Sequence, residues 1–162
     1  MFIATDPSTH QGKSNTWYTP EIYISSLGKF DLDPCTMSTR PFDTAIVHFE
    51  HDLEVNGLSE RWFGRVWLNP PYGKEMEPFV DKFIQHQDGL CLIFARMGNK
   101  SVQKLIKSKA NFFFLRKRIK FISESGSHQT NAGTDSCLVF YNEKDKQRIE
   151  KSGLDGVFLY SH

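Results

Sequence analysis

The chain has 162 residues, of which 39% are hydrophobic and 14% aromatic, and its formal net charge is +1. A chain of this length and composition can bury a packed core, so we expect one compact globular domain. No apolar run approaches the ~20 residues of a membrane-spanning helix, and the first six residues lack the basic and apolar stretches of a signal peptide. We therefore expect a cytoplasmic protein without a membrane partner.

The cysteine and histidine pattern argues against a metal site. The cysteines are far apart and form no Cys-x-x-Cys pair, which favours a reducing compartment over a zinc cluster. His48 and His51 have no companion at metal-ligand spacing. The cysteines are Cys35, Cys91 and Cys137.

Near the start of the chain, residues 5–14 are mostly polar. We expect residues 1–16 to form a flexible N-terminus and residues 17–162 to form the single domain. Trp17-Tyr18-Thr19-Pro20 then leads into a short amphipathic stretch that ends at Gly28. Thr19 suits an N-cap and Pro20 the first helical position, so this pattern predicts a short helix whose cap residues can also contact a ligand.

The alternation in Phe30-Asp31-Leu32-Asp33 predicts a strand that carries both carboxylates on one face. Asp33 ends this strand directly before Pro34, where ligands bind in open α/β sheets; a solvated polar face is the alternative. Only 36 positions separate Asp33 from Asn69, too few for two regular βα units. We expect the second unit to be truncated or irregular.

Asn69-Pro70-Pro71-Tyr72 is the most informative motif of the chain. It follows the apolar run Val66–Leu68, which predicts a buried strand, and it precedes a stretch with helical spacing of apolar residues. The motif is therefore expected at the carboxyl end of a strand. The helical positions are Met76, Phe79, Val80, Phe83 and Ile84.

The chemistry of this motif suits an exocyclic amine. The Asn69 carboxamide oxygen and the Pro70 carbonyl can each accept a hydrogen bond from an NH2 group, and Pro71 helps to hold them in a fixed array because proline locks φ. Two such acceptors would draw the amine toward tetrahedral geometry and free its lone pair for attack. Tyr72 could stack on the ring that carries the amine. A plain proline turn is the alternative.

The rest of the chain predicts alternating strands and helices. Residues 123–135 are polar and contain glycine, which predicts a mobile loop. The pattern as a whole indicates an α/β fold: a compact, partly truncated, mostly parallel Rossmann-like sheet with helices on both faces and antiparallel strands near its end. The further strands are expected at Leu90–Phe94, Asn111–Leu115, Ile119–Ile122, Cys137–Phe140 and Val157–Tyr160, and a short helix within Asn142–Lys151.

Charge is distributed unevenly. From Gly89 to Ser123 there are nine basic residues and no acidic one, so the remainder of the chain has a net charge of −8. Such a block favours a phosphate-facing surface over a merely solubilising one, and Phe121 beside it could stack on a base or belong to the core. The basic residues that we expect at this surface are Lys100, Lys104, Lys107, Arg116, Arg118 and Lys120.

The order of these motifs along the chain is informative as well. Trp17-Tyr18-Thr19-Pro20 is followed by Phe30–Cys35, then by Gly57-Leu58 with Trp62, and then by Asn69–Tyr72. In this order they resemble the small phage-encoded DNA adenine-N6 methyltransferases of the Dam type. The resemblance spans about Trp17 to Phe140.

The resemblance implies an S-adenosylmethionine (SAM)-dependent methyltransferase that flips adenine out of DNA and methylates its N6 amine at Asn69, Pro70, Pro71 and Tyr72. It departs from many SAM-dependent enzymes in lacking a glycine-rich turn after Asp33. The acidic residue that would bind the ribose is not identifiable, and Asp52 is a weak candidate. The residues that would lie beside SAM are Trp17, Thr19, Pro20, Asp33, Pro34, Cys35 and Asn69.

Two kinds of alternative stay open. The motif recognises only an amine, so the acceptor could be cytosine N4, RNA adenine or a protein amide. The chain could also be a degenerate methyltransferase fold that acts as a DNA-binding or host-interaction protein. The basic block favours nucleic acid over protein, and the intact motif favours an enzyme.

Overall fold

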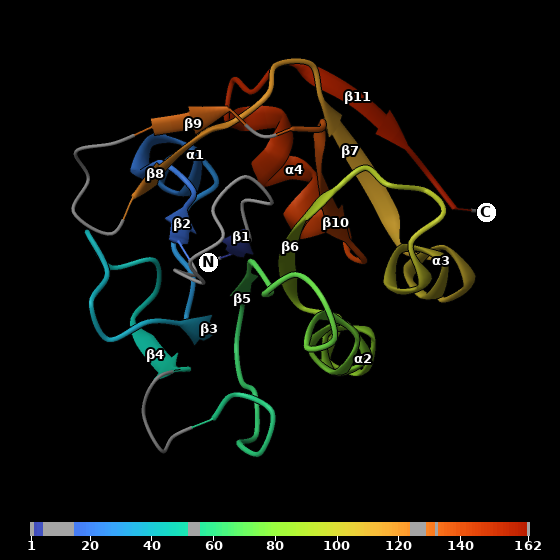
Figure 1. The fold of residues 1–162 in the computed structure, drawn as a ribbon. Helices are drawn as coiled ribbons and strands as arrows, with labels where there is room; N and C mark the ends of the chain where they lie inside the picture. The colour runs from blue at the N-terminus through green and yellow to red at the C-terminus, as the bar shows by residue number, and fades with distance from the viewer. Residues whose placement is uncertain (1, 5–14, 52–55, 124–128, 132, 162) are drawn as a thin grey trace.

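The computed structural model describes residues 2–4, 15–51, 56–123, 129–131 and 133–161. Within these residues the chain forms two β-sheets and four α-helices (Figure 1). The larger sheet has seven strands and the smaller sheet has four. The α/β class expected from the sequence is confirmed.

The larger sheet consists of β3 (Leu32–Thr36), β4 (Val47–Glu50), β5 (Val66–Leu68), β6 (Gly89–Phe94), β7 (Asn111–Leu115), β10 (Ser136–Phe140) and β11 (Gly156–Leu159). Their order is β11-β7-β10-β6-β5-β3-β4. β4, β3, β5 and β6 pair in parallel, whereas β10 pairs antiparallel with β6 and β7, and β11 pairs antiparallel with β7. Antiparallel strands occur late in the chain as predicted. The sheet is mixed rather than mostly parallel, because half of its pairings are antiparallel.

Helices cover both faces of this sheet. α2 (Met76–His86) and α3 (Lys100–Lys107) pack on one face, and α1 (Glu21–Ser26) and α4 (Glu143–Lys151) pack on the other. The strands supply both cores because successive side chains point to opposite faces. In β5, Val66 and Leu68 join the core under α2 and α3, while Trp67 joins the core under α1 and α4.

The order of the strands reverses between β3 and β5. After β3 the chain adds β4 on one side, and it then places β5 on the other side of β3, with β6 beyond it. Residues 37–46 join β3 to β4 without a helix, so the first βα unit is truncated. The second unit, for which truncation was predicted, has no helix in its described residues 56–65 either. In α/β sheets such a reversal opens a crevice outside the carboxyl ends of the strands, where ligands bind.

The smaller sheet is antiparallel and consists of β1 (Phe2–Ala4), β2 (Asn15–Tyr18), β8 (Lys120–Ser123) and β9 (Gln129–Asn131). It lies beyond the carboxyl end of β5 (Figure 1). Residues 123–135, predicted as one loop, contain β9, which pairs with β8 as a hairpin. Of the N-terminal segment predicted to be flexible, residues 5–14 lie outside the described residues and the two ends are strands.

A buried ion pair joins several elements at the amino edge of the larger sheet, which is the edge where the parallel strands β3, β5 and β6 begin. Arg65 Nε lies 2.6 Å from Asp145 Oδ1 of α4, and the two side chains are 3% and 1% exposed. Asp145 Oδ2 accepts the backbone N–H of Gly89 at 3.0 Å. The Arg65 guanidinium donates to the carbonyl oxygens of Leu27 and Lys29. The ion pair thus connects the end of α1, the first turn of α4, the residue before β5 and the first residue of β6.

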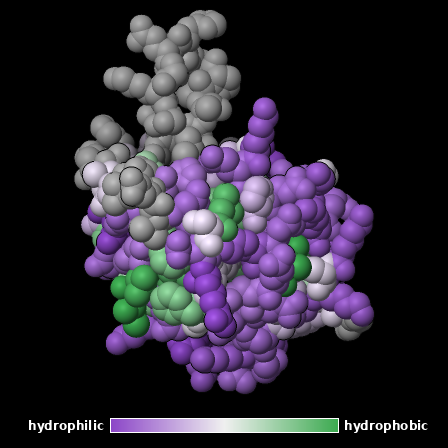
Figure 2. Space-filling view, turned by 90° about the horizontal axis from the view of Figure 1, so that it is seen from below, coloured by the Kyte–Doolittle hydropathy of each residue, from purple (hydrophilic) through white to green (hydrophobic). Residues whose placement is uncertain are grey.

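The outer surface of this arrangement is polar. The face turned toward the viewer in Figure 2 is mostly hydrophilic, and its apolar side chains gather in small groups. α2 and α3 each bury apolar side chains on one side and carry charged side chains on the other. None of the described helices is long and apolar enough to cross a membrane.

The ion pair at the amino edge yields a stability prediction. Asp145→Ala leaves the Arg65 guanidinium buried without its carboxylate, so the free energy of unfolding should fall by about 3–5 kcal/mol. Glu143→Ala is the matched control in the same helical turn, because Glu143 is exposed and pairs only with Lys146 among the described residues. Its effect should stay within about 0.5 kcal/mol. Urea denaturation measures both, and equal effects would contradict the role of the pair.

Candidate active site

The strand-order reversal brings two predicted motifs onto neighbouring strands. Asp33, Pro34 and Cys35 are the second to fourth residues of β3, which runs on to Thr36 instead of ending at Asp33 as predicted, and Asn69-Pro70-Pro71-Tyr72 directly follows β5, its parallel neighbour. Asp33 is 1% exposed and Asn69 2%. Both motifs therefore line the carboxyl edge of the sheet, at the crevice where ligands bind in α/β folds.

The Asn69 side chain is oriented by Thr19. Asn69 Nδ2 donates a hydrogen bond to Thr19 Oγ1 at 3.2 Å, and both residues are buried. This contact corrects the predicted cap: Pro20 is the N-cap of α1, the helix begins at Glu21, and no side chain caps it. The Thr19 hydroxyl, which was predicted to cap the helix, instead accepts from the NH2 group of the Asn69 amide. The Asn69 carbonyl oxygen is therefore the atom suited to accept a hydrogen bond from an amine.

Tyr72 is also held in place. Its hydroxyl accepts the backbone N–H of Phe94, at the end of β6, at 2.7 Å. The two rings stack with their centroids 4.4 Å apart and an interplanar angle of 21°. Burial raises the pKa of the Tyr72 hydroxyl well above its ordinary value, so it stays neutral. A ring that stacks on Tyr72 has to use the face opposite Phe94.

Phe121 lies one ring further into the molecule. It is 1% exposed and meets Phe94 edge-on, with centroids 6.1 Å apart. Its ring belongs to the core under α1 and α4. The sequence left open whether Phe121 stacks on a base or belongs to the core. The structure places it in the core, where it supports the Phe94 ring.

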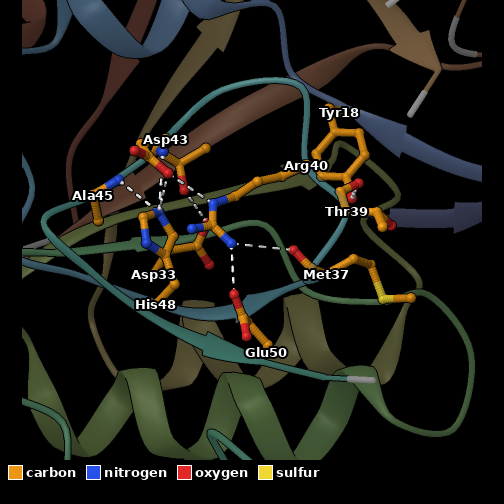
Figure 3. A network of polar contacts seen from close by, with 10 residues as sticks. Tyr18, Asp33, Met37, Thr39, Arg40, Asp43, Ala45, His48 and Glu50 are labelled. Atoms are coloured by element: carbon orange, nitrogen blue, oxygen red, sulfur yellow. Dashed lines mark hydrogen bonds and ion pairs between the residues drawn. The ribbon is translucent and has the colours of Figure 1, made fainter. Parts of the chain in front are cut away.

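The Asp33 carboxylate is engaged by the protein itself. Oδ1 accepts the backbone N–H of Cys35 at 3.0 Å, and Oδ2 accepts the Thr44 hydroxyl. Thr44 comes from the loop that joins β3 to β4, and Figure 3 shows this loop held by further polar contacts. Asp33 therefore shapes the backbone at the end of β3 and fixes the loop beside it. Sequence reasoning missed Thr44, since no local pattern indicates its partner.

A tight turn supports the end of β3 from the α2 side. Gly57 lies against Pro34 so closely that a Cβ would overlap the Pro34 carbonyl oxygen. The Gly57 carbonyl accepts from Trp62 Nε1 at 2.7 Å and from Lys82 Nζ of α2 at 2.9 Å. Gly57 and Trp62 belong to the motif series of the sequence, whereas Lys82 could not be found from it.

The thiols at and near this edge are not suited to nucleophilic chemistry. All three cysteines are free and buried. Burial raises the pKa of Cys35 far above its ordinary value, so the thiolate is not formed near neutral pH. Cys35 therefore contributes packing and its backbone N–H. Trp17 is half-buried against the core under α1 and α4.

Several side chains of the basic block, residues 89–123, form ion pairs with acidic side chains from other segments. Lys100 and Lys104 on α3 pair with Glu77 of α2 at 3.0 and 2.7 Å, and Lys104 also pairs with Asp81. The lysine face of α3 is thus partly neutralised by α2, contrary to the uncompensated charge that we inferred from the sequence. Arg116 and Arg118 pair with Asp155 and Asp135, each at 3.0 Å.

Topology separates the basic residues into two groups. α3 begins after the carboxyl end of β6 and runs back, so Lys107 at its end lies toward the amino edge, away from Asn69. β7 runs in the same direction as β6, because both strands pair antiparallel with β10. The loop that follows β7 therefore begins at the carboxyl edge. The carboxyl-edge basic residues are Arg96, Arg116, Lys117, Arg118 and Lys120, and all five are exposed.

The sequence predicted no metal site and offered only a weak candidate for the ribose contact. Among the described residues, no group of three or more His, Cys, Asp or Glu side chains could hold a metal ion. Asp52, the weak candidate for a ribose contact, lies outside the described residues.

Comparison with known protein families gives one match. The model of the family described as DNA N-6-adenine-methyltransferase (Dam) matches residues 6–154, which is nearly the whole chain. No curated protein and no solved structure matches the chain significantly.

The contact between Gly57 and Pro34 yields a prediction for this edge. Gly57→Ala should lower the free energy of unfolding by about 1–3 kcal/mol, because the added methyl group overpacks the end of β3. Gly98→Ala is the matched control, since a Cβ at Gly98 would meet nothing within 4 Å. Thermal unfolding of both variants measures the difference, and an unchanged Gly57→Ala protein would mean that the turn does not brace β3.

Proposed function

The chain belongs to the DNA N-6-adenine-methyltransferase (Dam) family, and we propose that it transfers a methyl group from SAM to the N6 amine of adenine in DNA at the Asn69–Tyr72 motif. The family implies adenine methylation in DNA in general terms. The observation that carries the finer proposal is the buried Asn69 amide, which Thr19 orients at the strand-order reversal. An amide fixed in this way is a preorganised acceptor for an amine.

The residues at the carboxyl edge fit the cofactor of such an enzyme. Thr36, the last residue of β3, has a buried hydroxyl with no hydrogen-bond partner among the described residues, as expected where a polar ligand is missing. SAM supplies an electrophilic methyl group when bound. The position of these residues at the carboxyl edge, beside the strand-order reversal, agrees with a Rossmann-like site. The residues that would hold SAM are Trp17, Thr19, Pro20, Asp33, Pro34, Cys35 and Asn69.

The motif would activate the amine by accepting its protons. Asn69 Oδ1 and the Pro70 carbonyl each accept one N6–H, which localises the nitrogen lone pair. The freed lone pair could then take the methyl group that bound SAM would supply, and the nitrogen would lose one proton. Positioning of the two reactants and preorganised acceptors supply most of the rate gain.

Adenine has to leave the duplex to reach this edge. Enzymes that act on a base flip it into a pocket, at a cost of a few kcal/mol. Stacking of the flipped base on Tyr72, opposite Phe94, would recover about 1–3 kcal/mol. Because Phe94 and the backbone hold Tyr72 rigidly, little further ordering is needed when the base arrives.

The DNA would approach the carboxyl-edge basic residues rather than α3. Arg96 extends from the end of β6 and lies over the Phe94 ring at 5.7 Å, next to Tyr72. The ion pairs of Arg116 and Arg118 are exposed at the surface, where such pairs contribute little and can exchange for phosphate contacts. Lys107 lies toward the opposite edge and is not part of this surface.

The proposed function is tested by methylation of plasmid DNA with tritiated SAM, followed by nucleoside analysis. Label in N6-methyladenine supports the proposal. Label in N4-methylcytosine would assign another acceptor, and absence of label with intact DNA binding would indicate a non-catalytic protein.

Asn69 should be essential for turnover. Asn69→Ala removes the preorganised acceptor and should lower the rate of methyl transfer by about 10²–10³. Affinity for SAM, measured by calorimetry, should change only a few-fold, because Asn69 is one of seven residues that would hold SAM, whereas its amide oxygen is one of only two acceptors for the amine. Near-normal turnover of Asn69→Ala would refute its role.

The DNA surface yields a second prediction. Reversing Lys117 and Lys120 to Glu should weaken DNA binding on every sequence, and it should lower the slope of the salt dependence by about 1 for each phosphate that the variant no longer binds. Reversal of Lys107 and Lys144, which lie toward the amino edge, is the matched control and should have little effect. Fluorescence anisotropy on a short duplex over a range of salt concentrations measures both quantities. Equal effects of the two pairs would place the DNA elsewhere.

A further inference from the structure

The loop that joins β3 to β4 replaces a crossover helix and needs its own support. Residues 37–46 contain no helix, yet they flank the end of β3. A helix would hold this position by apolar packing. Here Met37, Phe42 and Ala45 pack against the two cores, and the polar contacts drawn in Figure 3 add to this packing.

The first contact ties the loop to Asp33. The Thr44 hydroxyl donates to Asp33 Oδ2, and Thr44 is 7% exposed. The other carboxylate oxygen accepts the Cys35 N–H. A single buried carboxylate thus contacts both the end of β3 and the loop that leads to β4.

The second contact sets the position of Thr44 itself. His48 lies beside Asp33 in the sheet register. Its Nε2 accepts the backbone N–H of Thr44 at 3.2 Å and that of Ala45 at 3.3 Å. A nitrogen that accepts two N–H groups carries no proton, so this arrangement requires a neutral imidazole.

The remaining contacts hold the far side of the loop. Arg40 donates to Asp43 at 2.9 Å and to Glu50 of β4 at 2.7 Å. The Tyr18 hydroxyl, from the smaller sheet, donates to the Thr39 carbonyl at 3.1 Å. These contacts do not involve Asp33. The loop is instead linked to Asp33 by Thr44, whose position His48 sets.

We propose that Thr44 and His48 are positioning residues of the cofactor site: they lock the Asp33 carboxylate and the residues 37–46 loop in the shape that binds SAM, and protonation of His48 releases this lock. The inference rests on the proposed function, because it assumes that SAM binds beside β3. Neither residue needs to touch the cofactor.

The surroundings of His48 define the pH range of this effect. Burial lowers the pKa of His48 from its ordinary 6.5, and Arg40 acts in the same direction, whereas Asp33, Asp43 and Glu50 act against it. The unfolded chain binds the proton near pH 6.5, but the folded protein does so only at lower pH. Folding stability should therefore fall as the pH drops below 6.5, and the lock opens once the folded protein takes up the proton.

Calorimetric titration with SAM tests the role of Thr44. Thr44→Val keeps the shape of the side chain but removes the donor to a buried carboxylate, so the affinity should fall by about 10- to 100-fold. Thr44→Ser restores the hydroxyl and should restore most of the affinity. Far-UV circular dichroism verifies that both variants are folded. Wild-type affinity in a folded Thr44→Val protein would overturn the proposal.

A pH profile of SAM affinity between about pH 5 and 8 tests His48. The affinity of the wild type should decline toward the acidic end. His48→Gln offers an amide oxygen as acceptor but cannot titrate, so it should bind SAM near neutral pH and show a flatter profile. Identical profiles for both proteins would overturn the role of His48. Absence of SAM binding by the wild type at any pH would instead overturn the proposed function.

Discussion

The ion pair between Arg65 and Asp145 is the constraint on which the arrangement of the sheet depends. It joins residues 80 positions apart and buries both charges. Removing two charges from water is costly, so the pair adds less to stability than its short distance suggests, and its value lies in specifying one arrangement. Because Asp145 also binds the Gly89 N–H, the pair sets the starts of β5 and β6 side by side.

With the amino edge fixed, the carboxyl edge is free to carry the site. β5 is short, and Asn69 leaves it directly into the two prolines. The polar groups there are held by partners from elsewhere in the chain: Asn69 by Thr19, Tyr72 by the Phe94 N–H, and Asp33 by Thr44. A site built in this way is preorganised, because few side chains have to move when a ligand binds.

The fold lacks crossover helices on one side of the strand-order reversal between β3 and β5. Between β3 and β5 the described residues contain β4 and no helix, whereas α2 and α3 follow β5 and β6. α2 and α3 bury apolar side chains in the core beneath them, whereas residues 37–46 combine the apolar contacts of Met37, Phe42 and Ala45 with hydrogen bonds and ion pairs. The polar network thus lies where the crossover helix is missing, and it places a histidine beside the proposed cofactor site.

Features that depend on neighbours along the chain could be predicted from the amino-acid sequence. Helical spacing located α2, apolar runs located β5 and β6, and the residue types of Asn69–Tyr72 indicated an amine site at a strand end. Features that depend on contacts between distant elements became visible only in the folded protein. The neutralisation of Lys104 by α2 and the pairing of β9 with β8 could not be predicted, since the partners lie on separate segments. The same holds for the role of His48, because a histidine becomes an acceptor for a loop only when the strand register places it beside Asp33.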